Sequence, residues 1–263
     1  MRDDLGNRMK ENYENRAKTY LTRRTPVIIR LDGKAFHTFT RGFEKPFDEV
    51  LSRAMMKTMK YLCESIQGCV LGYTQSDEIT LVLVDYKNLN TSAWFDYGIQ
   101  KMCSVAASAA TLAFNRIFQS EHSEWYNVSP RDEKIAASHV ISIRRGALFD
   151  ARCFNIPKEE VNNCLIWRQQ DATRNSIQMV AQANFSHKQL ENKNCNQLQE
   201  LLLTEKGINW NNFPTCYKRG TCCRKVSYDD NTSTWEIDLD IPKFTEDRSY
   251  VNNLIDYNEN ANT

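Results

Sequence analysis

Residues 27–39 combine a short apolar run with an acidic turn. The run begins with three β-branched residues and ends at Asp32 and Gly33. Such a run before an Asp-Gly pair predicts a buried strand that delivers one carboxylate at its end. A second acidic turn, Asp77-Glu78, lies between two further strand-like runs. If these strands neighbour one another in a sheet, their carboxylates come together, an arrangement that suits a metal site.

The order of the predicted elements indicates an α+β protein. Apolar residues recur at helical spacing over 47–66, 91–118 and about 157–185, the last with a break expected near 171–175, and a polar loop is expected at 119–137. Strands are expected at 27–31, 69–74, 79–84, 140–143 and 148–154, the second and third as a hairpin. Both faces of 79–84 are apolar, which places that strand in the middle of a helix-covered sheet. The order is βαββαβ, an antiparallel-containing sheet with helices packed on one face.

The remaining segments are expected to extend this unit at both ends. Residues 4–22 have the pattern of an amphipathic helix packed on the body. The C-terminal part is expected to contain a short helix, a basic turn at 217–220, an edge strand and one alternating strand, at 196–203, 221–226 and 235–239 respectively. We therefore expect a catalytic core at 1–156, its helical continuation at 157–226 and an acidic extension at 227–263, disordered from Asn252 onward.

Composition and charge limit the function classes without choosing one. With 41% apolar and 25% charged residues, the composition is that of a globular protein. No apolar run approaches the length of a membrane span, so we expect a cytoplasmic protein without a membrane partner. The chain has 34 basic and 33 acidic residues, and four of the basic and nine of the acidic ones follow Cys223. Residues 1–223 therefore contain 30 basic and 24 acidic residues, an excess of six positive charges. A basic body suits a polyanionic partner such as RNA.

The two acidic turns fit the requirements of phosphoryl transfer. That chemistry needs magnesium to bridge phosphate oxygens, and magnesium prefers carboxylates, carbonyls and water. Asp32 and Asp77 are therefore predicted to hold the metal with the carbonyl of Gly33, and Glu78 to support or ligate it. No Gly-x-x-x-x-Gly-Lys-Ser/Thr loop occurs, so phosphate contacts must come from the amides of 33–37 and from lysines such as Lys34, Lys45 and Lys101. His37 could stack on or hydrogen-bond a nucleotide.

Five ordered blocks of this sequence resemble the tRNA-histidine guanylyltransferase superfamily. They are TPVIIRLDGKAFH from Thr25, FEKP from Phe43, YTQSDE from Tyr73, FDAR from Phe149 and WRQQD from Trp167. The resemblance implies a polymerase-like palm, two-metal catalysis with Mg²⁺, and nucleotide addition in the 3′-to-5′ direction at the 5′ end of tRNA. It implies catalytic roles for Asp32, Asp77 and Glu78, with Asp32, Gly33 and Asp77 as metal ligands. The nucleotide-binding residues it implies are Asp32, Gly33, Lys34, Ala35, Phe36, His37, Lys45, Ser76, Asp77 and Lys101.

One block departs from the eukaryotic pattern. Where those enzymes carry His-Ile-Asn-Asn after the Arg-Gln-x-Asp block, this chain has Thr173-Arg174-Asn175-Ser176. The change is similar to the Thg1-like branch, which implies template-dependent repair of 5′-truncated tRNA after activation of the 5′ phosphate by ATP or GTP. The resemblance also implies a homotetramer. Residues expected to contact tRNA are Arg144, Arg145, Arg152, Arg174, Asn175, Lys218 and Arg219.

Three alternatives remain open at this point. The chain could add a single guanosine at the −1 position of tRNA-His without repair. It could be a palm-domain nucleotide cyclase, which uses the same metals on a free nucleotide. It could also be a tRNA-binding module without catalysis, although the intact residues Asp32, Gly33 and Asp77 speak against that reading.

Overall fold

The chain folds around one six-stranded antiparallel sheet, seen in a computed structural model that describes residues 3–88, 90–128, 132–228 and 232–256. The strand order is β4-β1-β3-β2-β5-β6, and every pair of neighbours runs antiparallel. The strands are β1 Val27–Gly33, β2 Cys69–Gln75, β3 Glu78–Leu83, β4 Phe149–Asn155, β5 Thr221–Ser227 and β6 Ser233–Asp238. The helices are α1 Asp4–Met9, α2 Phe36–Phe39, α3 Glu49–Ser65, α4 Ile99–Val128, α5 Glu133–Arg145, α6 Lys158–Asn184, α7 His187–Leu190, α8 Cys195–Lys206, α9 Thr215–Arg219 and α10 Ser249–Ile255.

The predicted βαββαβ order is confirmed by β1, α3, β2, β3, α4 and β4. The hairpin of β2 and β3 is also as predicted, and every residue of β3 is buried. Helix α3 begins where the apolar periodicity placed it, because the Asp48 side chain accepts a hydrogen bond from the Leu51 amide and caps the first turn. Strand β3 therefore lies near the middle of the sheet, between β1 and β2.

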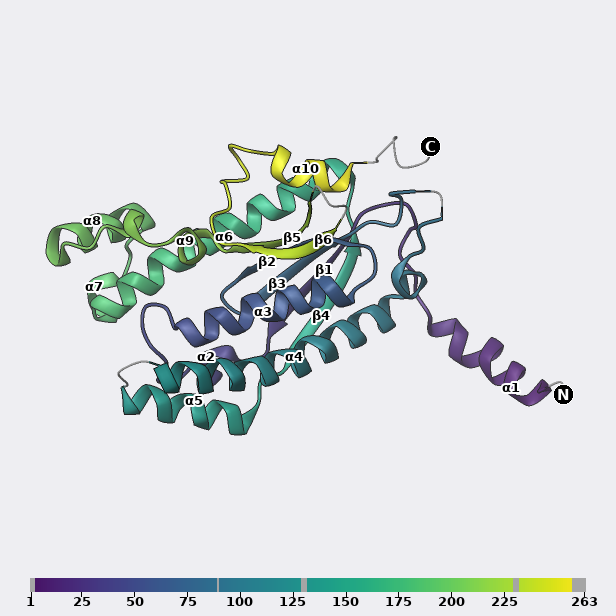
Figure 1. Ribbon diagram of the computed structural model, residues 1–263, viewed down its shortest axis with the longest axis horizontal. Helices are drawn as coiled ribbons and strands as arrows, with labels where there is room; N and C mark the ends of the chain where they lie inside the picture. Colours follow the sequence, from purple (N-terminus) through teal and green to yellow (C-terminus); the bar gives the residue numbers. More distant parts are fainter. Residues whose placement is uncertain (1–2, 89, 129–131, 229–231, 257–263) are drawn as a thin grey trace.

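The prediction that helices cover one face of the sheet is wrong, because helices pack on both faces (Figure 1). Alternate residues of β1 point to opposite sides, and they belong to different clusters of buried side chains. Ile29 lies in the cluster formed with α3 and α4, whereas Ile28 lies in the cluster formed with α6 and α10. The sheet is thus the middle layer of three.

Helix α5 replaces the strand predicted at 140–143 and the end of the loop predicted at 119–137. The β-branched residues there suggested a strand, but the side chain of Asp132 accepts from the Lys134 amide and starts a helix. Two arginines in the last turn and Gly146, with φ of 73°, end it. Helix α4 continues to Val128, so residues 119–128 are helical rather than a loop. Residues 129–131, which the loop prediction also covered, lie outside the described part of the chain.

Other boundaries differ in ways that follow from packing. Helix α6 runs without the expected break at 171–175, since Ala172 and Ser176 face the interior. Strand β5 lies inside the sheet, because β6 occupies the edge. Residues 217–219 of the predicted basic turn form the end of helix α9, and Gly220 follows the helix. The N-terminal segment has no buried residue and extends away from the body rather than packing on it (Figure 1). Within the described residues, no helix is long and apolar enough to span a membrane.

The C-terminal segment is part of the fold. Four of its apolar side chains are almost fully buried against the α6 face of the sheet: Ile241, Phe244, Val251 and Ile255. The Phe244 amide donates to the Gln169 side chain on α6, and Tyr86 donates through its hydroxyl to the Ile255 carbonyl. The disorder predicted from Asn252 is therefore wrong as far as Asp256, and residues 257–263 lie outside the described part.

Replacing Phe244 with Ala is expected to destabilise the protein by about 3–5 kcal/mol, because it empties a buried site that the sheet and α6 enclose. Urea denaturation measures the change. Leu239→Ala is the control, since Leu239 is 51% exposed in the same segment and its loss should change stability by less than about 0.5 kcal/mol. Equal effects of the two substitutions would mean that the segment is not part of the folded core.

Candidate nucleotide and metal site

The pairing of β1 with β3 brings the two acidic turns together. Asp32 lies opposite Glu78 across the two strands, and the Gly33 amide donates to the Asp77 carbonyl at 3.1 Å. Burial raises the pKa of the Asp77 carboxyl, and the nearby Asp32 carboxylate raises the same pKa further. The predicted juxtaposition of Asp32 and Asp77 is therefore present.

Glu78 is held by an arginine from α6. Arg168 donates through Nε to Glu78 Oε1 at 2.7 Å and through Nη2 to Asp171 at 2.7 Å, and both Arg168 and Glu78 are buried. Burial raises the pKa of Glu78, against the opposing effect of the Arg168 guanidinium. The ion pair fixes α6 to the end of β3 beside Asp77. With one oxygen engaged in this way, Glu78 acts here as a support, and its catalytic role stays a prediction.

The turn after β1 is held by aromatic packing. Ala35 takes a left-handed conformation, with φ of 55°, and Phe36 folds back over Gly33. A Cβ atom at Gly33 would lie 2.2 Å from the Phe36 ring, so only glycine fits there. The Phe36 ring contacts Phe114 and Phe149 with centroids 5.5 and 5.3 Å away. The turn is thus fixed from the α4 side of the sheet.

A cavity of about 730 Å³ opens beside this turn, within the size range of small-molecule sites. It is bounded by the turn after β1, the loop 40–48 before α3, the β2–β3 turn and the C-terminal half of α6. Predicted nucleotide-binding residues among its lining are Gly33, Ala35, Phe36, His37, Lys45, Ser76 and Asp77. Positions more than ten residues apart in sequence therefore meet at one opening.

Three predicted nucleotide-binding residues do not line this cavity. Asp32 is not among the lining residues, although its neighbour Gly33 is. Lys34 lines an adjacent cavity of about 480 Å³. Lys101 lies elsewhere, near the start of α4, where its ammonium is 4.5 Å from the centre of the Phe95 ring. Within one chain the structure does not bring Lys101 to Lys45, and its contact with the triphosphate stays a prediction.

The cavity also contains residues that sequence reasoning missed. Asp48, Glu44, Arg41 and Gln182 line it without having been singled out. Asp48 carried a usable signal, because an aspartate directly before a helical apolar pattern indicates an N-cap. Gln182 carried none, since its approach depends on how α6 crosses the sheet.

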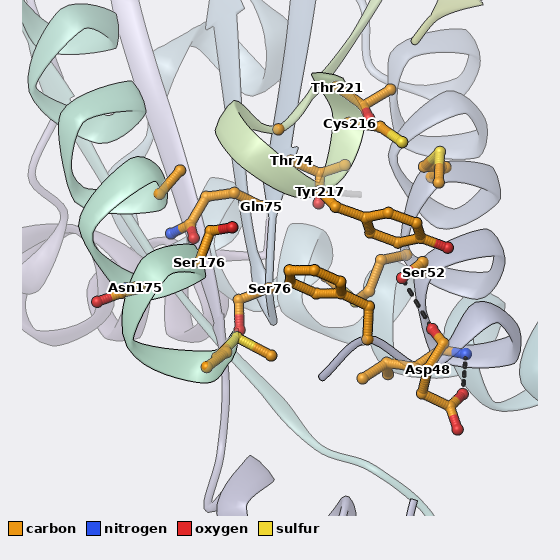
Figure 2. A pocket seen from close by; sticks show the side chains of 17 residues that line it. Asp48, Ser52, Thr74, Gln75, Ser76, Asn175, Ser176, Cys216, Tyr217 and Thr221 are labelled. Carbon is orange, nitrogen blue, oxygen red and sulfur yellow. Dashed lines mark hydrogen bonds between the residues drawn. The ribbon is translucent and has the colours of Figure 1, made fainter. Parts of the chain in front are cut away.

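A smaller cavity of about 100 Å³ adjoins the first (Figure 2). Side chains from α3, α6 and α9 surround it, and the ring of Tyr217 stacks on Phe47 with centroids 4.7 Å apart. Asp48 and Ser76 belong to the walls of both cavities. The two spaces therefore meet at the first turn of α3 and the β2–β3 turn.

The residues expected to contact tRNA are spread over several elements. Asn175 lines the smaller cavity, and Arg174 pairs with Asp171 on the same helix. Arg152 pairs with Asp150 on β4 at 2.9 Å, and Lys218 donates to the Asn211 carbonyl at 2.6 Å. The hydroxyl of Tyr73 donates to the carbonyl of Arg219.

Arg144 and Arg145 end helix α5. Arg145 donates to the Thr38 carbonyl at 3.0 Å, so it also holds the turn beside the cavity. The expected tRNA-contacting residues thus come from α5, β4, α6 and α9, and the tRNA contacts stay predictions.

The acidic pair fits a divalent cation. Two partly buried carboxylates lie close enough for one to raise the pKa of the other, and a cation between them would remove that repulsion. Among the described residues, no three His, Cys, Asp or Glu side chains form a metal cluster. Asp32, Asp77 and the carbonyl of Gly33 would therefore leave positions for water and phosphate, as Mg²⁺ prefers.

An antiparallel sheet with an acidic pair beside a nucleotide-sized cavity defines a nucleotide-binding α+β protein. A family model described as Thg1, tRNAHis guanylyltransferase, matches residues 6–157. The chain belongs to this family, whose members are nucleotidyltransferases that act on the 5′ end of tRNA.

Relatives and solved structures are similar to this chain over most of its length. R259 of Acanthamoeba polyphaga mimivirus is 29% identical over 97% of this chain and 89% of its own length. The tRNA(His) guanylyltransferase of Saccharomyces cerevisiae is 28% identical over 74% of this chain and 80% of its own length. A bacterial Thg1-like protein in complex with ATP matches with a TM-score of 0.83 and 44% identity, over 97% of this chain and all of that one. A bacterial Thg1-like protein in complex with GTP matches with a TM-score of 0.78 and 40% identity, over 96% of this chain and 99% of that one.

In EDTA at pH 7, Asp77→Asn is expected to raise the melting temperature, because ionisation of a carboxyl whose folded-state pKa is raised costs stability above that pKa. For a chain of this size, each kcal/mol of added stability raises the melting temperature by roughly 2–4 °C. The gain should vanish in acid below the ordinary aspartate pKa, where the carboxyl is protonated in both states. Calorimetry measures it.

Addition of Mg²⁺ should raise the melting temperature of the wild type and leave Asp77→Asn nearly unchanged, since ligand binding stabilises the folded state. A wild-type protein that does not respond to Mg²⁺ at saturating GTP would contradict the metal assignment.

Proposed function

We propose that this protein is a template-dependent 3′-5′ nucleotidyltransferase that adds nucleotides to the 5′ end of truncated tRNA after ATP or GTP activates the 5′ phosphate. The observation that carries the proposal is the cavity that brings Gly33, residues 35–37, Lys45 and Ser76 beside Asp77. Membership of the Thg1 family and the likeness to bacterial Thg1-like proteins in complex with ATP and GTP support it.

In this proposal the triphosphate lies in the cavity. The amides of the turn after β1 and the ammonium of Lys45 contact its oxygens, because both supply donors at the same opening. Asp32, Asp77 and the Gly33 carbonyl would hold two Mg²⁺ ions, which supply charge neutralisation and activation of the attacking hydroxyl when bound. Arg168 keeps Glu78 and the β3 end in place, so that Asp77 keeps its position as the substrates exchange.

The polymerase-like palm belongs to this proposal as well. The order β4-β1-β3-β2, with the acidic pair on neighbouring strands and helices behind them, supports it. In this proposal the RNA end approaches the acidic pair over β4 from the side opposite α4, where Asp150 lies opposite Asp32 and both Asp150 and Arg152 are exposed. This geometry lets nucleotide and RNA meet at the metals from different directions.

We prefer templated repair to the addition of a single guanosine because residues 173–176 differ from the His-Ile-Asn-Asn motif. Ser176 accepts a hydrogen bond from Trp210 Nε1 at 3.0 Å and is buried, so this position serves packing between α6 and the segment after α8. Asn175 faces the smaller cavity. In this chain the segment lacks the histidine of the His-Ile-Asn-Asn motif, whose enzymes add guanosine without a template.

We also propose that the protein acts in the cytoplasm as a homotetramer. The first helical segment exposes apolar side chains, among them Leu5, Met9 and Tyr13, that a second copy would cover. Light scattering on the purified chain measures the mass, and a monomer at micromolar concentration would remove the tetramer from the proposal.

Addition to a labelled 5′-truncated tRNA is expected to follow the base opposite the vacant position. Each nucleoside triphosphate is supplied separately, and the opposing base is varied through all four identities. Extension only by the complementary nucleotide supports templated repair. Guanosine addition regardless of the opposing base would support the single-addition alternative instead.

Asp32→Ala and Asp77→Ala are each expected to lower the rate of addition by roughly 100-fold or more, because a metal-centred charge stabilisation is worth several kcal/mol. Single-turnover extension of the truncated tRNA measures the rate, and circular dichroism checks the fold. Glu205→Ala, at an exposed position near the end of α8, is the control and should keep the wild-type rate. Near-normal extension by Asp77→Ala would overturn the mechanism.

A further inference from the structure

Helix α5 supports the wall of the nucleotide cavity along one of its faces. Arg145 donates to the Thr38 carbonyl, and Ser142 donates through its hydroxyl to the Phe39 carbonyl. One turn earlier, His139 Nε2 lies 2.9 Å from Asp48 Oδ2. Three contacts at spacings of three residues therefore join one helix face to residues 38–48.

The loop also approaches this face with its backbone. A Cβ atom on Gly42 would lie 2.3 Å from the hydroxyl of Ser138, and Gly42 has φ of 86°. Only glycine combines that conformation with that distance. The loop is thus pressed onto α5 between its two hydrogen-bonded ends.

Asp48 joins three parts of the molecule through one carboxylate. Its Oδ1 accepts from the Leu51 amide at 2.8 Å, and its Oδ2 accepts from the Glu44 amide at 3.1 Å and from His139 Nε2. The side chain is buried and belongs to the lining of both cavities. Figure 2 shows it at the smaller one. The carboxylate therefore fixes the backbone next to Lys45 relative to α3 and α5.

The histidine is itself held in one orientation. His139 is 1% exposed, and its ring meets the edges or faces of Phe43, Phe118 and Trp125 with centroids 4.5–5.6 Å away. Its Nδ1 lies 3.3 Å from Nδ1 of His122. Because a carboxylate only accepts, Nε2 carries the proton toward Asp48, and the two Nδ1 atoms share one hydrogen between the histidine rings.

We propose that His139 is a positioning residue for nucleotide binding. Through Asp48 it sets the position of the loop that carries Glu44 and Lys45, without contacting the nucleotide itself. The inference rests on the proposed function in one respect, namely that the cavity takes a nucleoside triphosphate. It makes α5, which does not itself line the cavity, a determinant of the affinity for the nucleotide.

Two polar substitutions separate the hydrogen bond from the loss of the ring. Glutamine places its amide nitrogen near the position of Nε2 and can still donate to Asp48, whereas asparagine is one methylene shorter and reaches only the position of Nδ1. His139→Gln should therefore bind GTP as tightly as the wild type, and His139→Asn about tenfold more weakly. Calorimetric titration of the full chain with GTP and Mg²⁺, without RNA, measures both.

A third variant covers the case in which the buried substitutions fail to fold. Arg145→Ala removes an exposed side chain that also holds the turn at Thr38, and it should weaken GTP binding about two- to threefold at an unchanged melting temperature. His187→Gln, a histidine on α7 outside both cavities, is the matched control and should bind GTP like the wild type.

Steady-state extension provides a second readout. A positioning role predicts that His139→Asn raises the KM for the nucleotide more than it lowers kcat, and that His139→Gln restores the KM. A folded His139→Asn protein with wild-type GTP affinity would overturn the inference, as would wild-type affinity in Arg145→Ala. A wild-type protein that binds GTP but does not extend tRNA would instead contradict only the proposed function.

Discussion

The antiparallel pairing of β1 with β3 is the constraint on which the site depends. It places Asp32 opposite Glu78 and joins Gly33 to Asp77, so two carboxylates lie close together at partly buried strand ends. Burial, and then the proximity of Asp32, raise the pKa of Asp77, which is unfavourable for the cation-free protein and suits one that binds a divalent cation. The helices on both faces keep the strands in this register, since β1 and β3 are buried on each side.

Much of this sheet could be predicted from the sequence. Apolar periodicity identified β1, the β2–β3 hairpin and α3, because each alternates or repeats in a way that matches its buried faces. The α5 segment was mistaken for a strand, since Val140 to Ile143 is rich in β-branched residues and the deciding signal was the Asp132 cap. The burial of Phe244 was missed, because acidic neighbours made its segment resemble a solvated tail.

The candidate site was predictable to the extent that its residues come from short turns. Gly33, residues 35–37, Ser76 and Asp77 meet at one cavity because strand order brings their turns together, and the loop before α3 adds Lys45. The contact of His139 with Asp48 spans 91 positions and depends on how α5 packs, which no local pattern reports. Lys101 is a different case, since the family resemblance implies a contact with the triphosphate, and within one chain the residue lies beside Phe95; its role stays a prediction.

The most direct test of the account is a crystal structure with GTP and Mn²⁺, because the anomalous scattering of manganese locates the ion independently of the nucleotide. The account predicts an ion bound by Asp32, Asp77 and the Gly33 carbonyl, with the triphosphate against residues 33–37 and Lys45. An ion held by other residues, or a nucleotide outside the cavity between the β1 turn and the loop 40–48, would contradict it.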